Sequence, residues 1–220
     1  MSRPGPAVTR IVLVRHGEAR CNVDRVVGGP RGCSGLSELG IRQGEALRDR
    51  LAATAELAGA AALYSSVLPR ARETAEIIAP AFGDLPVTED CDLCELHPGE
   101  CDGMTWAEFE ECYGAPQDDP DRPLSPGGES LAVFLERIAR VLRYLVAAHE
   151  GETVVAACHG GIVFGSLIRL LDLPLVGRPV SFEPTNAAIT EWLRVGGRWR
   201  LVRYNDAAHL VGVPAGSAPA

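Results

Sequence analysis

Three short apolar runs, each ending in polar residues able to do chemistry, constrain the fold of this chain more than any other feature of its sequence. The runs are "IVLV" before Arg15 and His16, "AALYSS" up to Ser66, and "TVVAAC" before His159. Short apolar runs rich in β-branched residues are typical of buried strands. Helical patterns separate the runs, and strands that alternate with helices form a mostly parallel sheet covered on both faces. The pattern predicts an α/β fold: a three-layer α/β/α sandwich with a mostly parallel central sheet.

The predicted helices carry recognisable start signals and apolar faces. Ser37 is a predicted N-cap for "ELGIRQGEALRDRLAATAELA", and Thr105 and Glu108 have capping-box spacing in "TWAEFEECYG". Gly83 closes the predicted helix "RARETAEIIAPAFG", a further helix starts at about Ile162, and "AAITEWLRVGGRWRLVRYN" predicts an antiparallel hairpin turning at its glycine pair. The clearest amphipathic helix, "ESLAVFLERIARVLRYLVAAHE", has apolar residues at helical spacing: Leu131, Leu135, Ile138, Leu142 and Leu145.

Length and composition favour a single domain. The chain has 220 residues, of which 46% are hydrophobic and 23% are charged, and these values are ordinary for one globular domain. We find no low-complexity linker and no internal repeat in the sequence. We therefore predict one domain over 1–220, with poorly ordered ends over 1–9 and 211–220.

Charge and apolar patterning argue against several classes of partner. The formal net charge is −8, from 29 acidic and 21 basic residues, which disfavours a nucleic acid or an anionic membrane surface as partner. The longest apolar stretch, "GIVFGSLIRLLDLPLV", is interrupted by Arg169, Asp172 and Pro174, so we do not expect it to span a bilayer. Prolines in "MSRPGPAVTR" fall where an export signal needs its apolar core. We expect a cytoplasmic location.

Seven cysteines, an odd number in a chain without an export signal, predict reduced thiols. Cys91, Cys94, Cys101 and Cys112 raise the alternative of a zinc site. However, the gaps after the first pair are six and ten residues, and the second pair of common zinc sites is missing. The favoured interpretation is that these thiols behave as small hydrophobic side chains, and we predict no metal ligands.

The polar residues after the three apolar runs are expected to meet. Polar residues and a glycine can simply end a strand. In a parallel sheet, however, ligands bind beyond the carboxyl ends of the strands. Arg15 and His16 follow the first run, Arg70 lies just beyond the second, and His159 follows the third. Arginine presents a fork of donors suited to phosphate, and histidine is a nucleophile or proton carrier near neutral pH. The arrangement predicts a cationic anion-binding pocket.

The sequence resembles the histidine phosphatase superfamily, which includes the cofactor-dependent phosphoglycerate mutases. The motifs that carry the resemblance are "VRHGEARCN", "LSELGIRQG", "SSVLPRARETA", "LCELHPGECDG", "PGGES" and "CHGGI". They occur in the family's order and extend from residue 11 to about residue 165. The "RHG" motif alone is moderately specific, whereas the ordered set is highly specific. The resemblance implies a phosphoglycerate mutase-like fold, with a single histidine phosphatase domain over 1–220.

The resemblance also implies the catalytic roles. His16 aligns with the nucleophile that becomes phosphohistidine. Arg15 and Arg70 match the two arginines that hold the phosphoryl group, and His159 matches the second histidine of that pocket. Glu95 aligns with the carboxyl group that gives a proton to the leaving group. Two arginines and a protonated histidine would neutralise the phosphoryl oxygens without a metal or other cofactor.

Further residues are predicted to bind the substrate. Asn22 falls at the family's asparagine position after the nucleophile, and Gly160 follows the second histidine as in the family. The loop "VVGGPRGCSG" is rich in glycine, which lets a backbone come close to another group. Gly28 and Gly29 of this loop therefore join the predicted substrate-binding residues.

Several assignments have nearby alternatives. Glu100 and Asp102 compete with Glu95 for the role of acid if the register of the motif is shifted. Arg72 competes with Arg70, but Arg70 fits the motif spacing and Arg72 is interpreted as a helix-surface residue. The other three histidines are interpreted as surface or loop residues: His97, His149 and His209. Of these, His97 lies near the predicted cleft.

Two departures from the mutase pattern favour a phosphatase. The stretch 113–125 is short and acidic, with Arg122 as its only base, whereas the mutases have a longer segment with an arginine pair. Pro98 replaces a tyrosine expected after the acid. Arg31 and Ser34 either shape substrate choice or belong to a surface loop.

We therefore predict a metal-independent phosphomonoesterase acting on a small phosphorylated metabolite. A phosphoglycerate-type mutase and a non-catalytic phospho-ligand binder on the same fold are the alternatives. The sequence does not identify the natural substrate. It also does not decide whether the protein forms a homodimer.

Overall fold

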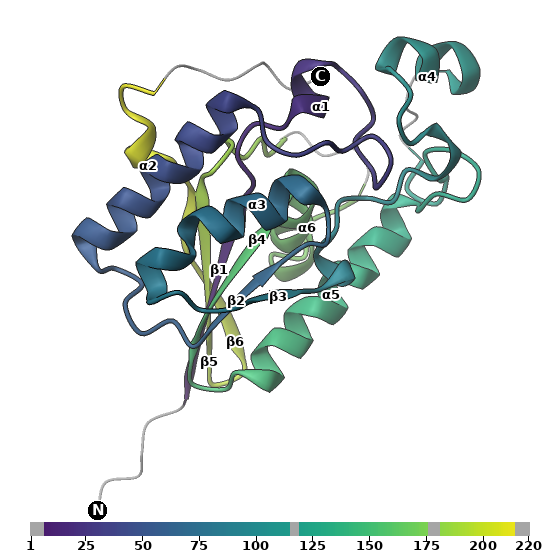
Figure 1. Cartoon of the computed structure of the whole chain (residues 1–220). Helices are drawn as coiled ribbons and strands as arrows, with labels where there is room; N and C mark the ends of the chain where they lie inside the picture. The colour runs from purple at the N-terminus through teal and green to yellow at the C-terminus, as the bar shows by residue number, and fades with distance from the viewer. Residues whose placement is uncertain (1–6, 115–118, 176–180, 214–220) are drawn as a thin grey trace, which may run out of the picture.

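A six-stranded sheet forms the centre of the molecule. The computed structural model describes residues 7–114, 119–175 and 181–213. The strand order across the sheet is β3-β2-β4-β1-β5-β6 (Figure 1). The strands are β1 (Val8–Arg15), β2 (Ala62–Ser65), β3 (Val87–Glu89), β4 (Thr153–Cys158), β5 (Ile189–Val195) and β6 (Arg198–Asp206).

The sheet is mostly parallel, as predicted. β1 and β4 pair in parallel, and so do β2 with β4 and β2 with β3. β5 and β6 form the predicted antiparallel hairpin, and β5 adds it to β1 at one side of the sheet. The short edge strand β3 was not predicted. The registers Arg15↔Cys158 and Ser65↔Ala157 bring the carboxyl ends of β1, β2 and β4 to the same edge.

Helices cover both faces of the sheet, which confirms the three-layer prediction (Figure 1). Alternate residues of β1 face opposite layers because side chains along a strand alternate in direction. The helices are α1 (Arg20–Val23), α2 (Glu38–Thr54), α3 (Pro69–Ile78), α4 (Trp106–Tyr113), α5 (Leu131–Ala148) and α6 (Gly160–Leu170). Ile11 and Leu13 pack in the core with α5 and α6, whereas Val12 and Val14 pack with α2 and α3.

The helix start signals act as predicted. The Ser37 side chain accepts a hydrogen bond from the Gly40 amide at the start of α2. Thr105 and Glu108 form the predicted capping box of α4. α6 begins directly after His159, slightly earlier than predicted.

The prediction of a poorly ordered N-terminal segment over 1–9 is wrong for Val8 and Thr9. Both residues belong to β1 and pair with β5, and the Thr9 hydroxyl accepts a hydrogen bond from the Gly151 amide. The threonine is buried because the sheet continues past the apolar run. Segments 1–6 and 214–220 of the predicted flexible ends lie outside the described residues. Within the described parts of the chain, no helix is long and apolar enough to cross a membrane.

Candidate active site

His16 lies at the carboxyl end of β1, where neighbouring groups hold its ring in one orientation. Its amide donates to the carbonyl of Cys158, at the end of the adjacent strand β4. Its Nδ1 lies 2.6 Å from the carbonyl oxygen of Gly17, and Arg70 Nε donates to its Nε2 over 3.0 Å. A carbonyl oxygen can only accept, so Nδ1 carries the ring proton and Nε2 keeps its lone pair. This is the tautomer that a nitrogen nucleophile requires.

The surroundings of His16 favour its neutral form. Its side chain is buried, and burial, followed by the charges of Arg70 and Arg15, lowers its pKa well below the ordinary value of 6.5. A protonated imidazole has no lone pair with which to attack phosphorus. These surroundings favour a neutral His16 with a free Nε2 lone pair, which the predicted nucleophilic role requires.

Arg70 links the nucleophile to the glycine-rich loop. It is the second residue of α3, it is buried, and its Nη1 donates to the carbonyl of Gly28 over 2.7 Å. By contrast, Arg72 is 43% exposed and faces Glu76 and Glu89 on the outside. The structure thus brings Arg70, and not Arg72, to His16.

Arg15 places a second guanidinium at the same edge. Its Nη1 donates to the carbonyl of Pro184, while its buried Nε has no hydrogen-bond partner among the described residues. Burial lowers the pKa of Arg15. The nearby charge of Glu95 raises this pKa and that of Arg70 lowers it, and the net effect is a lowered pKa. An arginine nevertheless keeps its charge at physiological pH. A buried, unpaired N–H on a charged group is a donor available to an anion.

His159 packs against the nucleophile. It is fully buried, and its ring centroid lies 5.1 Å from that of His16 at an interplanar angle of 62°. Its Nε2 lies 2.8 Å from Ser66 Oγ, whereas its Nδ1 is buried without a partner among the described residues. Burial first, and then the charges of Arg70, His16 and Arg15, lower its pKa well below 6.5. These surroundings favour the neutral form of His159 when no anion is bound, so its protonated form beside a phosphoryl group stays a prediction.

Glu95 reaches the same edge from the segment after β3. Its Oε2 accepts a hydrogen bond from the Gly161 amide at the start of α6, and its Oε1 accepts from the Leu96 amide, both over 3.0 Å. A Cβ atom on Gly161 would overlap Glu95 Oε1. Gly161 therefore lets the carboxyl group approach α6. Our sequence analysis missed this role, although "CHGGI" contains the residue.

The two alternative acids have other surroundings. Asp102 accepts hydrogen bonds from the amides of Arg31 (2.8 Å) and Gly32 (3.0 Å), so it anchors the glycine-rich loop. Glu100 is exposed. The geometry favours Glu95 as the acid near His159 and Arg15.

Arg137, which our sequence analysis also missed, holds the segment that carries Glu95. It comes from α5, is buried, and donates to the carbonyls of Cys94 (2.8 Å) and Glu95 (3.1 Å). Its guanidinium forms a bidentate pair with Glu129 at 2.8 and 2.6 Å. Burial would raise the pKa of Glu129, but hydrogen bonds from Arg137 and the His97 amide outweigh burial and lower it. Arg137 is a positioning residue for Glu95.

The predicted substrate-binding residues differ in their surroundings. Gly28 contacts Arg70, as described above. A side chain on Gly29 would meet Pro98 and Asp102, so this glycine lets two loops pack closely. Gly160 starts α6, and a Cβ on it would lie 3.5 Å from Arg15 Nε. Asn22 is exposed, and its Oδ1 accepts from the Ala19 amide in α1, so its binding role stays a prediction.

Comparison with known proteins identifies the class. From residue 11 to residue 207, the sequence matches the histidine phosphatase superfamily, branch 1. The metal-independent phosphoserine phosphatase of Arabidopsis thaliana is 32% identical over 213 residues, covering 94% of this chain and 85% of that protein. The glucosyl-3-phosphoglycerate phosphatase of Mycolicibacterium vanbaalenii is 30% identical, covering 92% of this chain and 97% of that protein.

A solved structure agrees with these relatives. The native mycobacterial glucosyl-3-phosphoglycerate phosphatase is similar with a TM-score of 0.75 at 30% identity, covering 90% of this chain and 99% of that chain. The chain therefore belongs to the histidine phosphatase superfamily, branch 1, and is an enzyme of the phosphatase class. These findings confirm the family, the phosphoglycerate mutase-like fold and the enzyme class that the motifs predicted.

Gly161→Ala is expected to slow hydrolysis of an alkyl phosphate by about 10-fold or more, because the new methyl group displaces the Glu95 carboxyl from its amide donor. Hydrolysis of p-nitrophenyl phosphate should fall less, since its leaving group needs little protonation. The ratio of the two kcat/KM values measures the effect, and thermal unfolding checks the fold. An unchanged ratio would contradict this role of Gly161.

Proposed function

We propose that this protein is a metal-independent phosphomonoesterase that hydrolyses a small phosphorylated metabolite through a phosphohistidine on His16. One observation carries the proposal. His16 Nε2 accepts a hydrogen bond from the buried Arg70, the charge of Arg15 also acts on His16, and His159 packs against its ring. The Glu95 carboxyl group lies at the same edge of the sheet.

The first step transfers the phosphoryl group to the protein. His16 Nε2 attacks phosphorus, the bond between phosphorus and the ester oxygen breaks, and the carboxyl group of Glu95 gives a proton to the departing oxygen. General acid catalysis of this kind contributes roughly 10²–10⁴-fold. Arg70 donates to the phosphoryl oxygens instead of to Nε2 as the new bond forms. The products are phosphohistidine and an alcohol.

The second step returns the nucleophile. A water molecule attacks the phosphohistidine, and the Glu95 carboxylate takes one of its protons. The N–P bond breaks, inorganic phosphate leaves, and His16 recovers its lone pair. Glu95 is protonated again for the next cycle, so protons balance over the two steps.

The charge needed for phosphoryl transfer comes from the protein's own side chains. Phosphoryl transfer mainly requires positioning and stabilisation of charge on the phosphoryl oxygens. Arg15 and Arg70 supply two fixed positive charges. A phosphoryl dianion beside His159 also favours the protonated form of this histidine, because an opposite charge nearby stabilises an ion.

A phosphatase is favoured over a mutase. The short acidic stretch 113–125 and Pro98 depart from the mutase pattern, and the relatives named above are phosphatases. Those names refer to phosphoserine and glucosyl-3-phosphoglycerate, so we propose a small phosphorylated metabolite as substrate. We also propose a cytoplasmic location, which the free state of all seven cysteines supports, and no nucleic-acid partner, which the net charge supports.

The test is phosphate release from p-nitrophenyl phosphate, followed by a mutase assay with 2,3-bisphosphoglycerate present and by a panel of phosphorylated metabolites. Phosphate release without mutase activity is the expected result. Mutase activity that exceeds hydrolysis would favour the mutase alternative. Binding of phosphate without turnover would identify a phospho-ligand binder.

Removal of divalent metals is expected to leave p-nitrophenyl phosphate turnover unchanged, because Arg15, Arg70 and His159 carry the charge. EDTA treatment followed by a steady-state assay measures this. Vanadate, which mimics pentacoordinate phosphorus, should inhibit at micromolar concentration or thereabouts. Loss of activity with EDTA and recovery with zinc or magnesium would contradict a metal-independent mechanism.

The pH dependence should reflect a neutral His16. Its pKa is lowered, so acidification through about pH 6.5 leaves the lone pair intact, whereas a histidine with an ordinary pKa would become protonated and inactive. We expect kcat/KM, corrected for ionisation of the substrate, to show no acid limb near that pH. A tenfold fall per pH unit beginning there would show that His16 has an ordinary pKa.

A further inference from the structure

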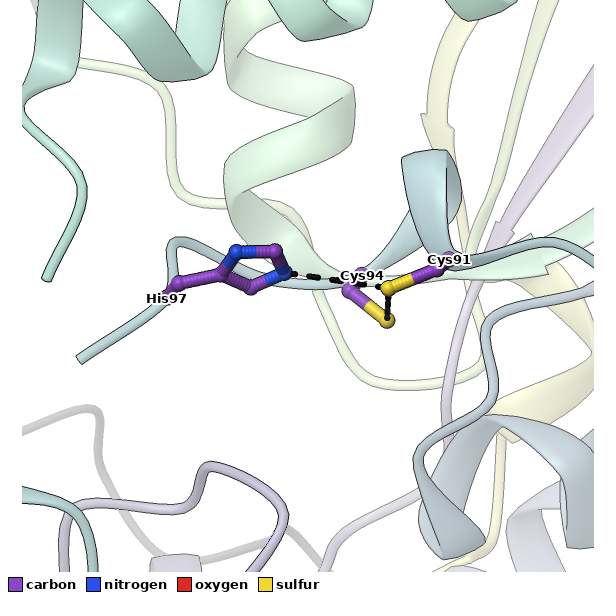
Figure 2. A group of neighbouring side chains, drawn as sticks. All are labelled: Cys91, Cys94 and His97. Carbon is purple, nitrogen blue, oxygen red and sulfur yellow. Dashed lines mark hydrogen bonds between the residues drawn. The ribbon is translucent and has the colours of Figure 1, made fainter. Parts of the chain in front are cut away.

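A second cluster of side chains that can bind a metal ion, two cysteines and a histidine, lies next to Glu95. Cys91 begins the short 3-10 helix Cys91–Leu93, Cys94 follows this helix directly, and His97 comes later in the same segment (Figure 2). Cys94 Sγ lies 3.7 Å from Cys91 Sγ, and Cys91 Sγ lies 3.9 Å from His97 Nε2. One ligand atom from each residue lies within 4.8 Å of the others. Two sulfur atoms and one imidazole nitrogen therefore lie close together.

These separations fit a tetrahedral zinc ion. Thiolates bind zinc at about 2.3 Å, so two of them on one tetrahedral ion lie about 3.8 Å apart. The separation of 3.7 Å between the cysteine sulfurs matches this value. A thiolate and an imidazole on the same ion lie about 3.6 Å apart, close to the 3.9 Å between Cys91 and His97. The ligand atoms of the third pair, Cys94 and His97, lie within 4.8 Å, so binding requires them to approach each other by at most about 1.2 Å.

Two further groups lie beside the cluster. His97 Nδ1 lies 3.8 Å from Glu129 Oε2, which is longer than a hydrogen bond, on the side of the ring opposite to Cys91. A small rotation of the ring brings Nδ1 to this carboxylate, and a carboxylate that accepts from a histidine ligand fixes the ring orientation. The Ser66 hydroxyl donates to Cys94 Sγ over 3.3 Å. Both groups are placed to support the ligands of an ion.

Arg137, which holds the segment of Glu95, also holds the backbone of the cluster. Arg137 Nη1 donates to the carbonyls of Asp92 over 2.9 Å and Cys94 over 2.8 Å. Arg137 also holds Glu129, the carboxylate behind His97. The backbone that carries the ligands is thus ordered before any ion binds, which lowers the ordering cost of binding.

We propose that Cys91, Cys94 and His97 bind one zinc ion. Thiolate and imidazole ligands select zinc over magnesium and calcium, which prefer oxygen. Cys91 is exposed, so the ion can enter from solvent and a water molecule can fill the fourth position. The ion takes no part in the bonds that break at phosphorus, so its removal leaves turnover of p-nitrophenyl phosphate unchanged. The sequence lacks the second cysteine pair of common zinc sites, and in this cluster the third ligand is a histidine.

Cobalt titration of the reduced, chelator-treated protein tests the proposal. We expect one cobalt per chain, with the intense visible bands of a tetrahedral site and a thiolate-to-cobalt charge-transfer band, and displacement by one equivalent of zinc. Zinc should also raise Tm, because an ion that binds the folded state stabilises it. These readouts do not depend on activity, so they can fail independently of the proposed phosphatase function.

Variants separate this site from adventitious binding. Cys91→Ser and His97→Gln should each weaken zinc binding by at least about 100-fold, since loss of an outer-shell partner alone costs roughly 10–100-fold. Cys112→Ser, in α4, is the matched control because it removes another exposed thiol, and it should bind zinc like the wild type.

Four results would overturn the proposal. The first is the absence of a charge-transfer band in the reduced protein. The second is unchanged zinc affinity in His97→Gln, and the third is equal loss of zinc binding in Cys112→Ser. A disulfide between Cys91 and Cys94 that persists under the reducing conditions of the titration would also contradict it, because the thiolates would then be unavailable.

Discussion

His16→Ala is expected to reduce turnover of p-nitrophenyl phosphate by on the order of 10⁴-fold or more, because it removes the atom that attacks phosphorus. Arg15, Arg70 and His159 remain in place, so the variant should still bind phosphate. Loss of kcat with retained phosphate affinity would locate the effect in the chemical step. Steady-state kinetics and phosphate titration measure the two quantities.

A second histidine provides the control for this variant. His149 follows α5 and precedes β4, so it lies towards the amino end of the strand whose carboxyl end reaches the site. It contacts Tyr64 and Glu152. His149→Ala should keep the wild-type turnover. Turnover of His16→Ala within tenfold of the wild type would exclude His16 as the nucleophile.

Glu95→Gln is expected to slow hydrolysis of an alkyl phosphate by roughly 10²-fold or more. The amide has nearly the shape of the carboxyl group but cannot give a proton to the leaving oxygen. An alkoxide is a poor leaving group and needs that proton, whereas the phenolate of p-nitrophenyl phosphate departs unaided. The loss should therefore be much smaller for p-nitrophenyl phosphate, and kcat/KM on both substrates measures the difference.

The neighbouring acids are the controls for Glu95. Glu100→Gln changes an exposed residue, and Asp102→Asn changes the anchor of the glycine-rich loop. Asp102→Asn can lower the affinity for substrate, but its effect should be the same for both leaving groups. If the loss of activity in one of these variants depends on the leaving group and the loss in Glu95→Gln does not, the acid lies later in the chain.

Local patterns were sufficient to predict most of the fold. The apolar runs that became β1, β2 and β4 are buried on both faces, so they contain few polar residues. The caps at Ser37 and Thr105 depend on residues close in sequence, and such short-range signals are readable. β3 has three residues, of which Thr88 and Glu89 are exposed. It pairs with β2 through the backbone, so its side chains carry no strand pattern.

The site was predictable where it follows from strand direction. Arg15, His16 and His159 follow parallel strands, and parallel strands end at the same edge of a sheet. The role of Arg137 was not predictable in this way. It lies within an amphipathic helix, and its partners in the segment around Glu95 are more than forty positions away. No local sequence pattern identifies an arginine that makes such long-range hydrogen bonds.

The protonation state of His159 also depends on the folded structure. The resemblance implied a residue that helps to hold phosphate, and a positive charge would serve that role. Its pKa is set by complete burial and by the nearby arginines, which are brought together only by folding. Gly161 and His97 are similar cases, because their importance depends on what packs against them.

Quenching the enzyme during turnover and locating the bound phosphoryl group tests the central claim most directly. The experiment uses a labelled phosphomonoester, rapid quenching in base, and peptide mapping by mass spectrometry. The mechanism predicts one acid-labile, base-stable phosphoryl group per active chain, on the peptide with His16, and no label in His16→Ala. An acid-stable phosphoryl group, or a label that persists in His16→Ala, would contradict the mechanism.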